Sequence, residues 1–120
     1  MLERRILLLE DEPEIAEILA LALDGEGYLV DLAATIAEAR ARLGMLNYCL
    51  VIADLRLPDG DGLEIAEHAA DLGAVTFIMS SYLFQLERGT ASRHELLMKP
   101  LRPSELVTAV QRRIGSGHHA

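Results

Sequence analysis

Five short apolar runs, separated by segments with helical periodicity, constrain how this chain can fold more than any other feature. The runs lie at residues 4–9, 28–33, 48–53, 75–79 and 96–98. Between and after them, apolar residues recur at helical spacing over 13–24, 35–43, 62–70 and 103–114. Strands that alternate with helices predict an α/β fold, in which helices cover both faces of a doubly wound parallel sheet.

Two segments carry weaker patterns. Leu83, Phe84 and Leu86 predict only one or two helical turns within residues 82–95, so we expect a short or irregular fourth helix there. Residues 115–120 are expected to form a disordered tail. The 120 residues suffice for one core and leave no room for a second, so residues 1–120 are expected to form a single domain.

Composition excludes several classes of protein. A net charge of −8 argues against a nucleic-acid-binding surface, which requires clustered Lys and Arg. No apolar run approaches the roughly 18 residues of a membrane span, and the amino terminus lacks a signal-peptide pattern. We therefore expect a cytoplasmic protein without membrane contact. Cys49 is the only cysteine and lies in an apolar run, which favours a reduced core residue.

Polar side chains follow four of the five runs at the points where the predicted strands end. They are Glu10, Asp11, Asp54, Ser80 and Lys99. Because the carboxyl ends of parallel strands meet at one edge of the sheet, we expect these groups to converge there. Three neighbouring carboxylates would repel one another by several kcal/mol unless a cation lies between them. Mg²⁺ prefers oxygen ligands, and together with Lys99 it would neutralise the three carboxylates.

A site neutralised in this way can accept a phosphoryl group. Asp54 is the expected nucleophile, which would form an aspartyl phosphate. Asp11 and Asp54 are expected to bind Mg²⁺ directly, and Glu10 through water. Lys99, the metal and the Ser80 hydroxyl would hold the equatorial oxygens of the transferred group.

Four motifs, in this order along the chain, resemble the receiver domains of two-component response regulators. They are ILLLEDEP at 6–13, the apolar run ending in Asp54 with LPDGDG at 57–62, Ser80, and Lys99-Pro100. The resemblance implies a flavodoxin-like sheet with strand order 2-1-3-4-5. It implies that Asp54 is the phosphoacceptor, Ser80 the switch hydroxyl, Lys99 the phosphate-contacting lysine, and Glu10 and Asp11 the acidic pair. It further implies that the backbone carbonyl of Arg56 is a Mg²⁺ ligand.

The chain departs from the family pattern at three places. Leu96 stands where members usually carry Tyr or Phe, the aromatic switch residue. The interval from Ser80 to Lys99 is about three residues shorter than usual, nearly one helical turn. Ser81 stands where Ala or Gly is usual, which leaves open that Ser81 supplies the switch hydroxyl. Tyr82 falls where a side chain can overhang the site, and its bulk is predicted to slow hydrolysis of the aspartyl phosphate.

Three classes of function follow. The first is a stand-alone or excised signalling domain, which is not an enzyme acting on other molecules. It would take its phosphoryl group from a sensor histidine kinase or a histidine phosphotransfer protein. The phosphorylated domain would then bind a partner protein with a different affinity. The second is a receiver-like interaction module that signals without phosphorylation. The third, a phosphatase with an aspartate nucleophile, is disfavoured because Arg56 stands where such enzymes carry a general acid. Oligomeric state stays open, a homodimer included.

Overall fold

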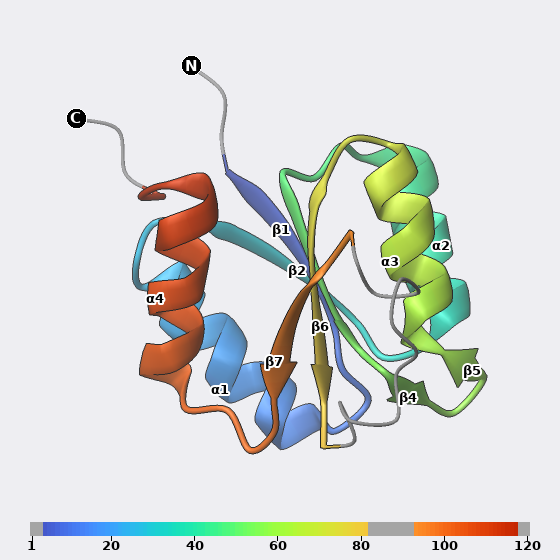
Figure 1. Cartoon of the computed structure of the whole chain (residues 1–120), viewed down its shortest axis with the longest axis horizontal. Coiled ribbons are helices and arrows are strands. Elements are labelled where there is room, and N and C mark those ends of the chain that lie inside the picture. The colour runs from blue at the N-terminus through green and yellow to red at the C-terminus, as the bar shows by residue number, and fades with distance from the viewer. Residues whose placement is uncertain (1–3, 82–92, 118–120) are drawn as a thin grey trace.

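Five parallel strands form a central sheet in the order β2-β1-β3-β6-β7 (Figure 1). The structure, a computed structural model, describes residues 4–81 and 93–117. The sheet strands are β1 (Arg5–Leu9), β2 (Leu29–Ala33), β3 (Leu50–Asp54), β6 (Val75–Ser80) and β7 (Glu95–Met98). The helices are α1 (Pro13–Asp24), α2 (Ile36–Met45), α3 (Gly62–Asp71) and α4 (Pro103–Ile114), and a small hairpin joins β4 (Arg56–Leu57) to β5 (Gly60–Asp61).

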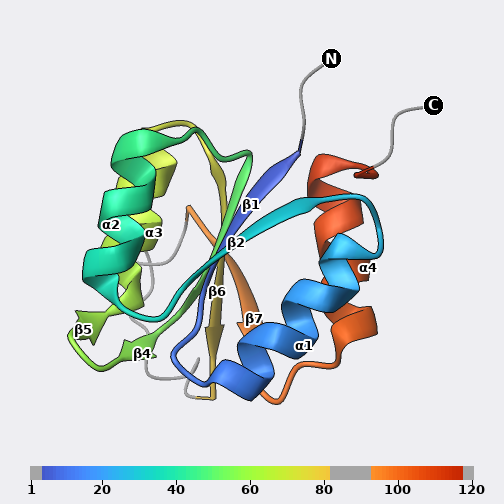
Figure 2. The same cartoon turned by 180° about the vertical axis from the view of Figure 1, so that it is seen from behind.

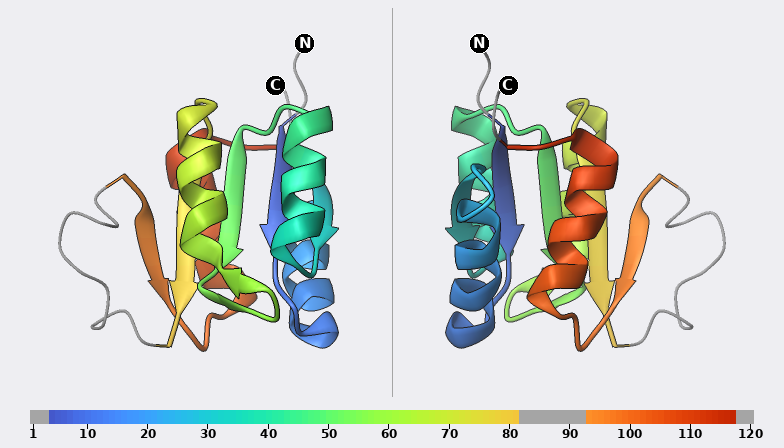
Figure 3. Two further views of the ribbon diagram at one scale, coloured as in Figure 1. Left: turned by 90° about the vertical axis from the view of Figure 1, so that its right-hand side faces the viewer. Right: turned by 90° about the vertical axis from the view of Figure 1, so that its left-hand side faces the viewer.

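The helices cover the two faces of the sheet in pairs, α1 with α4 and α2 with α3 (Figures 2 and 3). Alternate residues of each buried strand serve opposite faces. On β1, Ile6 and Leu8 pack toward α1 and α4, whereas Leu7 and Leu9 pack toward α2 and α3. Strands buried on both faces explain the continuous apolar runs in the sequence. The predicted α/β fold and its strand order are confirmed.

Two details of the loops and helices differ from the expectation. Helix α2 continues through Gly44 to Met45, because nothing crowds the exposed Gly44 and the Leu46 N–H still bonds to the Arg42 carbonyl. The β4–β5 hairpin was not predicted, since two residues per strand are too few to show a period. The predicted irregular fourth helix falls mostly on residues 82–92, which lie outside the described residues, as does Tyr82.

The described part of the expected tail, residues 115–117, contacts other parts of the domain. Residues 115–117 are held against the start of the fold, because the Tyr28 hydroxyl donates to the Gly115 carbonyl at 2.5 Å and Arg4 Nε donates to the Ser116 carbonyl at 3.0 Å. Gly117 is buried against the turn before β2. Residues 115–117 of the expected tail therefore contact the fold, and residues 118–120 lie outside the described part of the chain. None of the described helices has the length and apolarity needed to cross a membrane.

Candidate functional site

The ends of four neighbouring strands bring all five predicted polar residues to one edge of the sheet. Glu10 and Asp11 follow β1, Asp54 is the last residue of β3, Ser80 ends β6, and Lys99 follows β7. The strands are paired so that they end nearly level: Leu9 lies beside Ala53, Asp54 beside Met79, and Ser80 beside Met98. The apolar strand interiors therefore carry these groups to a common site.

Lys99 joins two carboxylates from different strands. Its Nζ lies 3.0 Å from Glu10 Oε1 and 2.9 Å from Asp54 Oδ2. Both carboxylates are nearly inaccessible to solvent, with Glu10 2% and Asp54 6% exposed. Buried charges of this kind are stable when they are paired and hydrogen-bonded. The contact spans 89 residues between Lys99 and Glu10, so it depends on the tertiary fold.

The site raises the pKa values of Glu10 and Lys99. Burial raises the pKa of the Glu10 carboxyl to about 7; the hydrogen bond from Lys99 opposes this shift and the neighbouring Asp54 adds to it. Burial by itself lowers the pKa of Lys99, but the hydrogen bonds to Asp54 and Glu10 more than offset it, so the net shift is upward. Lys99 is therefore a firmly charged cation, whereas Glu10 can exchange a proton near neutral pH.

A cavity of about 250 Å³ opens beside these groups, lined by polar residues only. They are Asp11, Glu12, Asp54, Arg56, Ser80, Ser81 and Lys99. Ser80 is buried and Ser81 is exposed, so both hydroxyls remain candidates for the same role. Glu12 was not among the predicted site residues, although its place in the acidic run that follows the first strand was a signal for it.

Carboxylates that could hold a cation gather at the start of α1. Ligand oxygens of Glu10, Asp11 and Glu12 all lie within 4.8 Å of one another. Asp54, which we predicted as a direct ligand, is outside this group: its Oδ2 accepts from Lys99, and its Oδ1 accepts from the Arg56 N–H at 3.3 Å. Oxygen donors alone suit a hard cation such as Mg²⁺.

The backbone after Asp54 is packed so closely that position 62 requires glycine. A Cβ at Gly62 would lie 1.8 Å from the Asp54 carbonyl oxygen. The Gly62 N–H also donates to the Leu55 carbonyl at 2.8 Å, and the Leu55 N–H donates to the Met79 carbonyl at 2.9 Å. The start of α3 thus rests directly on the Asp54 backbone and restricts its movement.

Comparisons with known proteins agree with this geometry. The family profile described as the response regulator receiver domain matches residues 6–111. The transcriptional regulatory protein ResD of Bacillus subtilis is 30% identical over 113 residues, which cover 91% of this chain and 47% of ResD. The chain spans about half or less of the length of curated relatives that it matches.

Solved structures show the same fold. A receiver domain protein from Methanospirillum hungatei superimposes with a TM-score of 0.82 at 27% identity, covering 93% of this chain and 94% of that one. The response regulator TrrA of Thermotoga maritima, solved in complex with Mg²⁺ and beryllium fluoride, has a TM-score of 0.81 at 31% identity and covers 91% and 97%. With the profile match spanning most of its length, the chain belongs to the response regulator receiver domain family of two-component systems.

Proposed function

We propose that Asp54 accepts a phosphoryl group from a phosphohistidine of a sensor histidine kinase or a histidine phosphotransfer protein, in a reaction that requires Mg²⁺. One observation carries this proposal: the Asp54 carboxylate ends a buried strand, borders a polar cavity and lies 2.9 Å from the Lys99 ammonium. A carboxylate that is held in place and still faces a cavity is suited to act as a nucleophile.

In the proposed step, an Asp54 oxygen attacks phosphorus. A P–O bond forms while the P–N bond to the donor imidazole breaks, and the electron pair of that bond stays on the imidazole nitrogen. Phosphoryl transfer asks the protein mainly for positioning and for neutralisation of charge. The Lys99 ammonium and the hydroxyl of Ser80, or alternatively of Ser81, would contact the equatorial oxygens.

The donor set fits a magnesium ion. Glu10, Asp11, Asp54 and the Arg56 carbonyl are the groups we propose to hold it, with Glu12 close to the first two. When bound, Mg²⁺ would neutralise the negative charge of the carboxylates and of the incoming phosphoryl oxygens. The complex of TrrA with Mg²⁺ and beryllium fluoride supports a site of this kind in a related fold.

The output of the reaction would be a change in binding to another protein. Phosphorylation can shift such binding only if the two states bind the partner with different affinities. ResD is a transcriptional regulatory protein of about twice this length, but the present chain has a net charge of −8. We therefore propose that these residues regulate a protein partner and do not contact nucleic acid themselves.

Intact mass after incubation with acetyl phosphate tests the proposal. The wild-type protein is expected to gain one phosphoryl mass with Mg²⁺ and none with EDTA. Asp54→Asn is expected to gain none under either condition, because an amide is a poor nucleophile. Asp24→Asn is the matched control, since it changes an exposed aspartate at the end of α1 and should be phosphorylated like the wild type.

The possible results separate the candidate functions. A folded wild-type protein that gains no mass would contradict the proposal and favour the interaction module that signals without phosphorylation. A gain that persists in Asp54→Asn would place the modification on another residue. Circular dichroism of each variant establishes that the fold is intact.

A further inference from the structure

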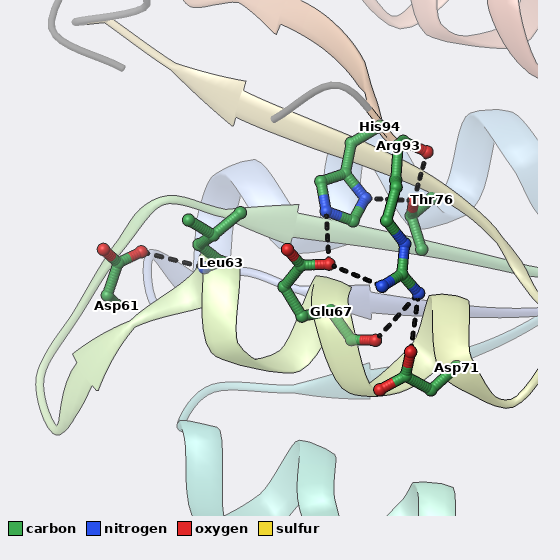
Figure 4. A network of polar contacts seen from close by, with 7 residues as sticks. All are labelled: Asp61, Leu63, Glu67, Asp71, Thr76, Arg93 and His94. Atoms are coloured by element: carbon green, nitrogen blue, oxygen red, sulfur yellow. Dashed lines mark hydrogen bonds and ion pairs between the residues drawn. The ribbon is translucent and has the colours of Figure 1, made fainter. Parts of the chain in front are cut away.

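The loop between β3 and α3 holds backbone atoms against the Asp54 carboxylate. The loop folds into the small β4–β5 hairpin, with Arg56 paired to Asp61. From this hairpin the Arg56 N–H donates to Asp54 Oδ1 at 3.3 Å. At the end of the loop, Asp61 caps α3 by accepting from the Leu63 N–H at 2.8 Å (Figure 4). The position of the hairpin therefore decides where the Arg56 backbone lies.

Asp59, at the tip of this hairpin, attaches the loop to a different helix. Its Oδ1 accepts from the Ile36 N–H at 2.8 Å and its Oδ2 from the Ala37 N–H at 3.1 Å. These N–H groups belong to the first two residues of α2, where a helix offers donors without intrahelical partners. The adjacent Gly60 has φ +149°, and a Cβ there would lie 2.9 Å from Ile36 Cδ1. The hairpin thus lies directly on the first turn of α2.

Helix α2 has a second cap that comes from its own sequence. Thr35 Oγ1 accepts from the Glu38 N–H at 3.1 Å. Since Thr35 serves the third N–H of the helix and Asp59 serves the first two, loss of the Asp59 carboxylate would leave the local cap in place. The main consequence of that loss would be a hairpin no longer fastened to α2.

We propose that Asp59 is a positioning residue for the phosphorylation site, which it serves by fastening the hairpin to α2. This inference rests on the proposed function, because the group that it positions is the Arg56 backbone. Arg56 donates its N–H to Asp54, and its carbonyl is a proposed Mg²⁺ ligand. Asp59 itself does not line the cavity beside Asp54, so it acts through the loop and not on the phosphoryl group.

The expected consequence is a loss of Mg²⁺ affinity without a loss of reactivity. A loosened hairpin lets the Arg56 carbonyl move away from the ion, so that binding the ion has to restore the ordered loop. Once Mg²⁺ is saturating, the loop is held again, and Asp54 and Lys99 are unchanged. The effect therefore separates into a change of the Mg²⁺ dependence and an almost constant maximal rate.

The test measures Mg²⁺ binding by titration calorimetry, and the Mg²⁺ concentration that gives half-maximal phosphorylation by acetyl phosphate. For Asp59→Ala we expect both constants to rise by about tenfold, the lower end for residues that orient a metal ligand. The rate at saturating Mg²⁺ should stay within about twofold of the wild type. Hydrogen exchange of the Ile36 and Ala37 amides should become faster, because both lose their acceptor.

Two variants test whether the tether itself is the cause. Asp59→Asn removes the charge and keeps one of the two acceptor oxygens, so its Mg²⁺ affinity should lie between those of the wild type and Asp59→Ala. Thr35→Ala removes the other cap of α2 and should lower stability while leaving Mg²⁺ binding unchanged.

The inference is overturned if Asp59→Ala binds Mg²⁺ like the wild type, or if Asp59→Asn or Thr35→Ala weakens binding as much as Asp59→Ala does. Those results would leave the phosphorylation of Asp54 untouched. A wild-type protein that binds no Mg²⁺ would instead contradict the proposed function, and this inference with it.

Discussion

The pKa of Glu10 reflects the burial and the neighbouring charges of the site. It is almost fully buried between Lys99 and Asp54, and its carboxyl has a pKa of about 7. Because this pKa lies above the usual value of 4.5, the folded protein holds the Glu10 proton more tightly than the unfolded chain does. Stability therefore falls as the pH rises from about 4.5 through about 7.

This behaviour predicts the effect of Glu10→Gln. In EDTA, the wild-type free energy of unfolding should fall by about 2 kcal/mol more than that of the variant between about pH 5.5 and pH 8. At pH 8, Mg²⁺ should stabilise the wild type more than the variant, because the variant lacks one of the carboxylates proposed to hold the ion. Urea denaturation followed by circular dichroism measures both effects. Glu14→Gln, an exposed change in the first turn of α1, should behave like the wild type, and equal slopes for all three proteins would contradict the prediction.

Between elements, a network of polar contacts with buried Thr76 and His94 at its centre connects the residues before β7 to β6 and α3 (Figure 4). The ring of His94 is inaccessible to solvent; its Nδ1 pairs with the Thr76 hydroxyl, and its Nε2 lies 3.3 Å from Glu67 Oε2. Arg93 reaches the same Glu67 carboxylate at 3.3 Å and Asp71 at 2.8 Å. Burial lowers the pKa of His94, although the Glu67 carboxylate opposes this shift.

His94 gives the protein a pH dependence of the opposite sign to that of Glu10. Because the fold favours neutral His94, the unfolded chain takes up this proton first, and stability falls as the pH drops through about 6.5 and below. His94→Gln should remove this part of the decline, as measured by urea denaturation at several pH values. His68→Gln, on the exposed side of α3, should leave the decline unchanged. A decline of wild-type size in His94→Gln would contradict this assignment.

For the whole molecule, the two ends of the described chain support each other. Tyr28 donates a hydrogen bond to the backbone carbonyl of Gly115, and Arg4 donates one to the backbone carbonyl of Ser116. Gly117 lies against the turn before β2. A Cβ at Gly117 would come within 2.6 Å of the Gly27 and Tyr28 backbone. Residues 115–117, which follow the last helix, thereby become part of the fold.

Gly117→Ala should therefore destabilise the protein by about 1–3 kcal/mol, because the added Cβ would clash with backbone atoms, which cannot move aside as a flexible side chain can. Hydrogen exchange at residues 115–117 should also become faster. Gly44→Ala is the matched control: it lies in α2 with open space around its Cβ, so it should leave stability unchanged or raise it by up to about 1 kcal/mol. If both variants had the same effect, residues 115–117 would not be docked in solution.

Local patterns in the sequence were enough to predict the five strands of the main sheet, the four described helices and the edge of the sheet where Asp54 and Lys99 meet. Strand and helix periods are short-range properties, and the direction of parallel strands places their carboxyl ends together. The strand order was predicted from the resemblance to receiver domains, because the local sequence pattern does not determine which strands are neighbours in the sheet.

Contacts between distant residues were decided by the tertiary structure. The bridge from Lys99 to both Glu10 and Asp54, the tether from Asp59 to α2 and the docking of Gly117 join residues that are far apart in the sequence. Many side chains in the sequence could form such hydrogen bonds, and local periodicity does not distinguish among them. Only the packed backbone, by excluding water and fixing distances, selects which partners meet.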